Sequence, residues 1–251
     1  MRRLIFIALF LLLPAFALAV GNMPDNISKA QRSVAALPLG QRIAFWAEQF
    51  IGTPYDTDPL GAYVRSKEIV YDSAVDCMYH TFRAVELSMG NSPEEAAAAA
   101  LNLRFKDRGT LDAIGKVTNY DNRFEYAEDM ILSGKWGTDI TAELGEVVKI
   151  KGARGIESTE IIPKDTIVNS PDKLYSKLNS GDIIYFIKAV DKRVVGEIVA
   201  HLGIIKREGG KVYLIHASGR KNAQTPSYVK KLPLEDYIGQ MSFIGIKVTR
   251  F

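Results

Sequence analysis

Residues 71–90, "YDSAVDCMYHTFRAVELSMG", contain Cys77, the only cysteine of the 251-residue chain. From Asp72 onward the apolar side chains recur at helical spacing, and Gly90 is typical of a helix end. The apolar stripe consists of Met78, Phe82, Val85 and Met89. The pattern predicts a helix that carries the thiol of Cys77 in or near its first turn.

Two residues are candidates for the N-cap of this helix. Ser73 and Asp76 have the spacing of a capping box, and Asp76 alone is also a good N-cap, so both remain open. In either case the thiol lies near free backbone N–H groups and the positive end of the helix dipole, which favour the thiolate. The carboxylate of Asp76 acts in the opposite direction, so a base has to contribute more to the deprotonation of Cys77.

The first twenty residues, "MRRLIFIALFLLLPAFALAV", have the pattern of a secretory signal peptide. Two arginines precede an apolar run over residues 4–16, which closes on Ala17-Leu18-Ala19, a small-x-small cleavage site. We expect residues 1–19 to be removed and Val20 to begin the mature chain; an uncleaved anchor is the alternative. Because residue 20 is not cysteine, no lipid anchor is expected, and the protein is predicted to be exported, either periplasmic or secreted.

The charge of the chain excludes one large class of function. The formal net charge is +3 for the whole sequence and +1 after loss of the two arginines of the signal peptide. A near-neutral chain without dense Lys/Arg runs is not expected to bind nucleic acid. No later segment reaches about 20 consecutive apolar residues, so no membrane anchor is expected after cleavage. The sequence specifies no oligomeric state.

The remaining chain has the size of one domain. We divide it into an N-terminal helical leader at residues 20–40 and a single domain at residues 41–251 that contains the candidate catalytic residues. About residues 91–180 form a long insertion between the cysteine and the later histidines. We interpret this insertion as an elaboration of the same domain because no clear linker separates it.

A lone cysteine is unusual in an exported chain, because exported proteins mostly hold their cysteines in disulfide pairs. Cys77 has no partner in the sequence. It is therefore either a small buried hydrophobic residue or a thiol kept for chemistry.

Helical patterns come first in the chain and strand patterns follow. The segment "QRIAFWAEQFIGTPY" has helical spacing up to Gly52 and Pro54. Strand patterns occur in "SGDIIYFIK" and "MSFIGIKVTRF", and "EIVAHLGIIKREGGKVYLIHASGR" has two of them around a Glu-Gly-Gly turn, the signature of a hairpin. This order predicts an α+β fold in which N-terminal helices are followed by an antiparallel meander.

The three histidines of the chain have different settings. His80 follows Cys77 by three residues on the predicted helix, so its ring is expected to point along that helix in a structural or peripheral role. With a turn centred near Gly209, His201 and His216 lie close to opposite each other on the two arms of the hairpin. We expect these two rings to be neighbours.

Cys77, His201 and His216 together supply the parts of an activated nucleophile: a thiol, a base, and a polar ring that orients the base. A histidine base is apt because its ordinary pKa is close to neutral pH. The alternatives are two histidines that merely share a hairpin face, or a Cys/His/His zinc site. Because the sequence has no short ligand pair such as CxxC or HExxH, neither a metal ion nor another cofactor is predicted.

Several short motifs occur in an order that resembles the NlpC/p60 superfamily of cell-wall cysteine hydrolases. They are "FIGTPY", then "DC" at the start of a helix, then "GDIIYF", "HLGII" and "IHAS". The resemblance covers about 200 residues and implies a papain-like fold with an insertion between the cysteine helix and the histidine hairpin. It also implies that Cys77 is the nucleophile, His201 the general base and His216 the third polar residue.

Two longer segments are similar to one branch of that superfamily, the DUF1460-type proteins related to N-acetylmuramoyl-L-alanine amidases. These segments are "RIAFWAEQFIGTPY" and "YAEDMILSGKWGTDIT". The likeness implies hydrolysis of the amide between the lactyl group of muramic acid and L-alanine, in muropeptides with an anhydro sugar. In many common members Ser-Gly-Phe follows the cysteine, whereas Met78-Tyr79-His80 follows it here, which argues against their γ-D-Glu-diaminopimelate endopeptidase activity. That activity, transfer of the acyl group to an acceptor other than water, and a non-catalytic wall-binding role are the alternatives.

Further residues are candidates for contacts with this peptidoglycan substrate. Tyr55 is a candidate oxyanion donor or substrate contact, against the alternative of a core tyrosine with a bonded hydroxyl. Asp76 is expected to order the helix start more than to enter the chemistry, and Ser218 either lines the site or belongs to a turn. Arg220 and Lys221 are either contacts for peptide carboxylates or solvated loop charges.

Overall fold

The structure is a computed structural model that describes residues 26–222 and 224–251. The predicted signal peptide at residues 1–19 and the first residues of the leader lie outside the described residues. Within the described ranges, no helix is long and apolar enough to cross a membrane.

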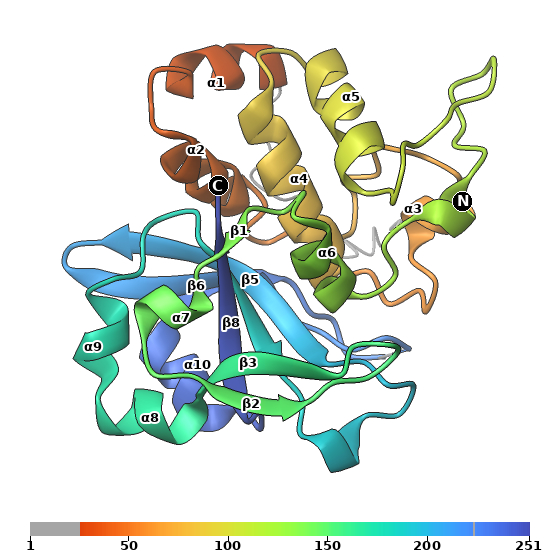
Figure 1. The fold of residues 1–251 in the computed structure, drawn as a ribbon. Coiled ribbons are helices and arrows are strands. Elements are labelled where there is room, and N and C mark those ends of the chain that lie inside the picture. Colours follow the sequence, from red (N-terminus) through yellow and green to blue (C-terminus); the bar gives the residue numbers. More distant parts are fainter. Residues whose placement is uncertain (1–25, 223) are drawn as a thin grey trace, which may run out of the picture.

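An antiparallel sheet lies between two groups of helices (Figure 1). The helices are α1 (Ile27–Val34), α2 (Leu39–Gln49), α3 (Ala62–Arg65), α4 (Cys77–Met89), α5 (Pro93–Leu103), α6 (Ala127–Ser133), α7 (Thr141–Leu144), α8 (Lys164–Asn169), α9 (Pro171–Tyr175) and α10 (Leu234–Gln240), with short 3-10 turns η1 (Tyr120–Asn122) and η2 (Val190–Lys192). The strands are β1 (Thr138–Asp139), β2 (Val148–Lys151), β3 (Ser158–Pro163), β4 (Ile183–Ile187), β5 (Val199–Glu208), β6 (Lys211–Ala217), β7 (Val229–Pro233) and β8 (Gly245–Arg250). The α+β class with an antiparallel sheet is confirmed.

The strand order differs from the predicted meander. It runs β2-β3-β8-β4-β5-β6-β7, with β1 paired to β8, so the last strand of the chain lies in the middle of the sheet. Ile246 and Val248 of β8 are fully buried, one reason why this strand is central. The insertion supplies β1, β2 and β3, and β1 and β3 pair with β8, so it is part of the same sheet.

Each face of the sheet carries its own hydrophobic core. Helices α2 and α4 cover one face, and α8, α9 and α10 cover the other (Figure 1). Successive residues of β4 alternate between the two cores: Tyr185 belongs to the first, and Ile184 and Phe186 belong to the second. All five residues of β4 are buried because both faces are covered, which explains the continuous apolar run of this strand.

The N-terminus of α4 is capped by Asp76, whose Oδ1 accepts a hydrogen bond from the backbone N–H of Tyr79 at 2.8 Å. Of the two candidate N-caps, the structure therefore has Asp76 and not Ser73. From Tyr79 to Ser88 the helix is buried on every side, so the single apolar stripe predicted for it is too narrow. Met89, placed on that stripe, is 37% exposed because it lies in the last turn.

The leader contacts the domain through α1, and α2 begins within its last two residues. Gln31 of α1 is buried, and its amide donates hydrogen bonds to the backbone oxygens of Leu87 and Ser92 at 3.1 and 3.3 Å. The predicted helical spacing of α2 is confirmed, since its apolar residues Ile43, Trp46 and Ala47 are fully buried. The helix starts earlier than predicted, at Leu39, immediately after Pro38.

Candidate active site

The hairpin of β5 and β6 brings His201 and His216 together. Gly209 and Gly210 form a two-residue turn with φ of +57° and +80°, and Glu208 pairs with Lys211. The turn is centred between the two glycines, so the histidines are diagonal neighbours instead of nearly direct partners as predicted. Because they are offset by two residues they share one face, and His201 Nε2 lies 2.7 Å from His216 Nδ1.

Gly203 makes room for the second histidine. Continued register places Gly203 across from His216, and a Cβ on Gly203 would lie 3.0 Å from the Cβ of His216 and 2.7 Å from the backbone oxygen of Ile215. A side chain at this position would therefore displace the ring of His216 or the strand that carries it.

Two aromatic rings hold the histidine pair in place. Phe186 of β4 stacks on His201 with ring centroids 6.3 Å apart. Tyr237 of α10 contacts both imidazoles, with centroid distances of 5.9 Å to His201 and 5.0 Å to His216. Sequence analysis missed Tyr237, since a tyrosine in a short late helix carries no local sign that it packs against a hairpin.

Burial keeps both imidazoles of the pair neutral. It lowers the pKa of His201 to about 4, with a further decrease from the nearby His80. It lowers the pKa of His216 to about 3, with a further decrease from His201 itself. Near neutral pH, one ring therefore donates the shared hydrogen bond and the other accepts it.

The thiol of Cys77 lies beside β5. The backbone N–H of Leu202, the residue after His201, and the N–H of Met78 point toward the sulfur. Cys77 itself is half-buried. Within residues 26–222 and 224–251, the structure has no hydrogen bond between the Cys77 thiol and the imidazole of His201 or His216. Hydrogen bonds between a nucleophile and its base are commonly long before substrate binds.

The resting thiol is protonated. Burial, followed by the Asp76 carboxylate, raises the pKa of Cys77 above its ordinary value, and the N–H of Leu202 and the Lys221 ammonium offset only part of this increase. The preference for thiolate expected from the helix start is thus outweighed by desolvation. Deprotonation needs a base close to the sulfur.

Tyr55 closes one side of the site. Its backbone N–H donates to the oxygen of Ser227 at 2.7 Å, and its ring lies against Gly219, where a Cβ would be 2.2 Å from the ring. Burial, followed by the charges of Cys77 and Asp76, raises the pKa of its phenol. The hydroxyl of Tyr55 is therefore protonated in the neighbourhood of Cys77 and Asp76.

The loop that follows β6 carries the remaining candidates. Ser218 is half-buried, continued register places it across from His201, and its backbone N–H donates to the oxygen of Tyr228 at 3.1 Å. Arg220 is exposed. Lys221 turns inward, and its Nζ donates to Asp76 Oδ2 at 2.9 Å. Lys221 thus forms an ion pair with Asp76 within the protein. The two predicted roles, a contact for peptide carboxylates and a solvated loop charge, did not include such a pair.

His80 lies in the core beneath the site. Its ring is buried, with Nε2 3.2 Å from the backbone oxygen of Ala47, and it packs nearly perpendicular to the ring of Phe50. Burial lowers its pKa to about 4. These contacts fit a structural role for His80, as expected from its position three residues after Cys77.

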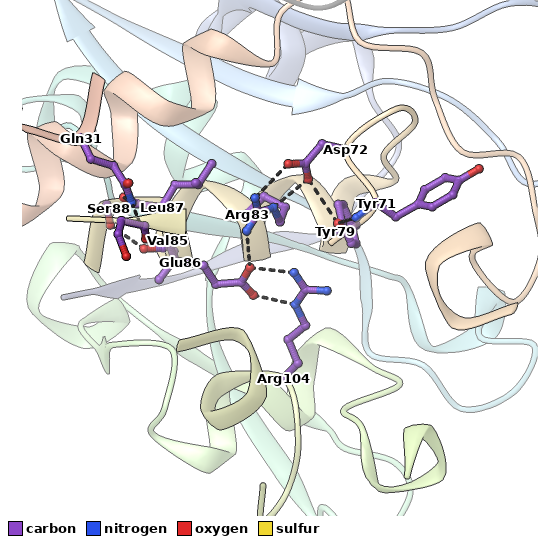
Figure 2. Close-up of polar contacts among 11 residues, drawn as sticks. Gln31, Tyr71, Asp72, Tyr79, Arg83, Val85, Glu86, Leu87, Ser88 and Arg104 are labelled. Carbon is purple, nitrogen blue, oxygen red and sulfur yellow. Dashed lines mark hydrogen bonds and ion pairs between the residues drawn. The ribbon is translucent and has the colours of Figure 1, made fainter. Parts of the chain in front are cut away.

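A buried ionic network supports the segment that leads into Cys77 (Figure 2). Asp72 accepts hydrogen bonds from Arg83 at 2.7 and 2.8 Å and from the hydroxyl of Tyr79 at 3.2 Å. Arg83 also donates to Glu86, which accepts two further bonds from Arg104, each 2.6 Å long. The network ties the residues before the thiol to the buried body of α4. Sequence analysis missed it because Asp72 and Arg104 lie 11 and 18 residues along the chain from their partners, although Arg83 and Glu86 are only three residues apart.

The buried histidines predict that stability falls in mild acid. The pKa values of His80, His201 and His216 are all lowered on folding, from about 6.5 to about 3 or 4. Below about pH 6.5 the unfolded chain binds protons that the folded chain does not, so the free energy of unfolding decreases as pH falls toward 4. Each histidine contributes a slope of up to about 1.4 kcal/mol per pH unit.

Urea unfolding between pH 5 and 7.5 measures this dependence. The variant His80→Gln has one buried histidine fewer, so the slope is expected to decrease by up to about 1.4 kcal/mol per pH unit. A profile that is flat between pH 5 and 6.5 would show that the three rings are not held neutral in the folded protein.

The described residues contain no group of three or more His, Cys, Asp or Glu side chains arranged to hold a metal ion.

The fold that carries this site recurs in solved structures. An N-acetylmuramoyl-L-alanine amidase from Bacteroides uniformis superimposes with a TM-score of 0.63 at 21% identity, over 84% of this chain and 98% of that chain. A DUF1460 protein from Legionella pneumophila gives a TM-score of 0.65 at 18% identity, over 88% of this chain and 92% of that chain.

A third structure, a protein from Bacteroides fragilis provisionally named a xylanase, gives a TM-score of 0.60 at 23% identity, over 82% of this chain and 99% of that chain. No family model and no curated protein matches the chain. At these identities the likeness establishes a shared fold, and the chemistry has to be argued from the site.

Proposed function

We propose that this protein is a cysteine hydrolase of the papain-like, NlpC/p60 type that cleaves the N-acetylmuramoyl-L-alanine amide of peptidoglycan fragments, most readily those with an anhydro sugar. One observation carries the proposal: a lone thiol at the start of a buried helix lies beside a strand whose histidine, His201, is hydrogen-bonded to His216 at 2.7 Å. An oriented base next to a thiol is what covalent acyl transfer requires.

The geometry of the histidine pair assigns the roles of its nitrogens. Because Nε2 of His201 is used in the bond to His216, the nitrogen left to act as base is Nδ1. His201 then donates its Nε2 proton to Nδ1 of His216, and Nδ1 is free to take the proton of Cys77. His216 thus fixes the useful tautomer of His201 and stabilises the imidazolium that forms.

The reaction follows the acyl-enzyme scheme. The Cys77 sulfur attacks the lactyl carbonyl as His201 takes the thiol proton, and the tetrahedral oxyanion forms. The imidazolium returns that proton to the amine of L-alanine, the C–N bond breaks, and the stem peptide leaves. Water then attacks the thioester with His201 as base, which releases the muramyl acid and restores the thiol.

Two donors are available for the oxyanion. The backbone N–H of Cys77 belongs to the first turn of α4, where N–H groups have no partner within the helix. The hydroxyl of Tyr55, kept protonated by its raised pKa, is the second. Ser218, at the start of the loop after β6, is assigned to substrate contact.

The choice of substrate rests on two supports. Structures with the same fold include an N-acetylmuramoyl-L-alanine amidase, and the segments "RIAFWAEQFIGTPY" and "YAEDMILSGKWGTDIT" resemble the DUF1460-type branch. The signal-peptide pattern of residues 1–19 supports a site of action outside the cytoplasm, where peptidoglycan lies.

Product identification tests this function. The mature chain, residues 20–251, is incubated with a defined anhydro-muropeptide and with intact sacculi, and the products are identified by mass. We expect a free stem peptide that begins with L-alanine, released faster from the anhydro fragment. Cleavage after D-glutamate would replace the amidase with an endopeptidase, and no cleavage together with a thiol inert to alkylation would overturn the enzymatic proposal.

A further inference from the structure

The carboxylate of Asp76 has two roles that oppose each other. Its Oδ1 caps α4 and so sets the position of Cys77 at the helix start. Its negative charge also lies one residue before the thiol, where it opposes the formation of a second negative charge on the sulfur. For a catalytic thiol in this position, the capping hydrogen bond of Asp76 is useful, whereas the negative charge of Asp76 hinders deprotonation.

Lys221 reaches this carboxylate from a distant part of the chain. Its Nζ lies 2.9 Å from Asp76 Oδ2 and 3.1 Å from the backbone oxygen of Asp56, and 5.8 Å from the centre of the Tyr55 ring. Both members of the ion pair are shielded, with side-chain exposures of 30% for Lys221 and 15% for Asp76. An ion pair in such a setting is stronger than one on an open surface.

Backbone contacts keep the loop of Lys221 against the site. The N–H of Asn222 donates to the oxygen of Thr57 at 2.9 Å, and the N–H of Tyr55 donates to the oxygen of Ser227 at 2.7 Å. The segment before Lys221 is held by Tyr55 itself, whose ring lies on Gly219. The ammonium is therefore delivered to Asp76 by a docked loop.

The groups whose charges or dipoles act on the thiol come from several elements. They are the Asp76 carboxylate and the Met78 N–H from the start of α4, the Tyr55 hydroxyl, the Tyr237 hydroxyl from α10, the Leu202 N–H from β5 and the Lys221 ammonium. His201 and His216 are neutral near neutral pH. Of these groups only Lys221 carries a positive charge in the resting site.

We propose that Lys221 is a positioning residue of the hydrolase: its ammonium holds the Asp76 carboxylate in the capping position and offsets its charge, so that His201 can deprotonate Cys77. This inference rests on the proposed function and adds to it a residue that acts through Asp76. Arginine at position 221 preserves the charge, whereas glutamine removes it.

Thiol alkylation tests the inference without any substrate. The rate of reaction with iodoacetamide is measured from pH 7 to 9 for the wild-type mature chain and for Lys221→Gln, Lys221→Arg, Asp76→Asn and the double variant Asp76→Asn/Lys221→Gln. Without Lys221 the charge of Asp76 acts on the sulfur unopposed and raises the pKa of the thiol, so Lys221→Gln is expected to react about tenfold more slowly at each pH. Lys221→Arg is expected to react at nearly the wild-type rate.

The double variant separates charge from folding. Asparagine is as good an N-cap as aspartate, so Asp76→Asn keeps the helix start while it removes the charge that Lys221 offsets. We expect the double variant to return to within about threefold of the wild-type rate, a residual set by the weaker direct effect of Lys221 on the thiol. Equal or faster alkylation of Lys221→Gln, or no recovery in the double variant, would overturn the role of Lys221.

The same variants are then assayed with the anhydro-muropeptide. If the alkylation rates follow the expected order but no variant cleaves the substrate, the proposed function fails while the electrostatic coupling of Lys221, Asp76 and Cys77 stands. If the wild-type protein cleaves the substrate and Lys221→Gln keeps the wild-type pH profile of kcat/KM, the positioning role fails while the proposed function stands.

Discussion

Replacement of Cys77 by alanine is expected to lower kcat/KM for the muropeptide by about 10⁴-fold or more. The thiol is the group that forms the acyl-enzyme in the proposed reaction, and no other cysteine exists in the chain to substitute for it. The remaining site would still bind substrate and orient the carbonyl, so KM is expected to change much less than kcat.

The structure provides a matched control for this loss. Ser73, the candidate N-cap that the helix does not use, is exposed and lies four residues before the thiol. Ser73→Ala is expected to keep wild-type activity, and Cys77→Ala is expected to keep the wild-type melting temperature to within a few degrees, since alanine is well tolerated in a helix. Cleavage by Cys77→Ala at a rate near wild type would remove the thiol from the mechanism.

Replacement of Glu86 by glutamine is expected to lower the free energy of unfolding by about 3–5 kcal/mol. Glu86 is fully buried, and its carboxylate accepts hydrogen bonds from Arg83 and Arg104, which are 2% and 1% exposed (Figure 2). Both guanidinium groups pair with Glu86, and Arg83 pairs also with the more peripheral Asp72. Without the charge of Glu86, two buried cations face one carboxylate.

Urea denaturation of the wild type and the variant measures this effect. The control is Asp58→Asn, which breaks the ion pair between Asp58 and Arg65, where the arginine side chain is 62% exposed. No measurable change is expected from this control, because exposed ion pairs contribute little. If Glu86→Gln were as stable as the control, the buried network would not be holding the segment before Cys77.

Individual helices and strands could be predicted from the sequence, because their spacing of apolar residues depends only on neighbours along the chain. Helical spacing located α2, and strand patterns located β4 and the hairpin of β5 and β6. The period of two along a strand also predicted that His201 and His216 are neighbours, and they are, although a turn centred half a residue later makes them diagonal. Their roles and that of Cys77 stay predictions that the proposed experiments test.

Features that depend on partners far along the chain were decided by the tertiary structure alone. Contacts between remote segments inserted β8 into the middle of the sheet and brought Tyr237 and Lys221 to the site. The choice of Asp76 over Ser73 as the cap was also visible only in the structure, because both residues fit the local pattern. The increase in the pKa of Cys77 was likewise decided by the tertiary structure, because desolvation depends on every atom around the sulfur. Local spacing and capping act over a few residues, whereas burial and charge pairing are set only once the chain has folded.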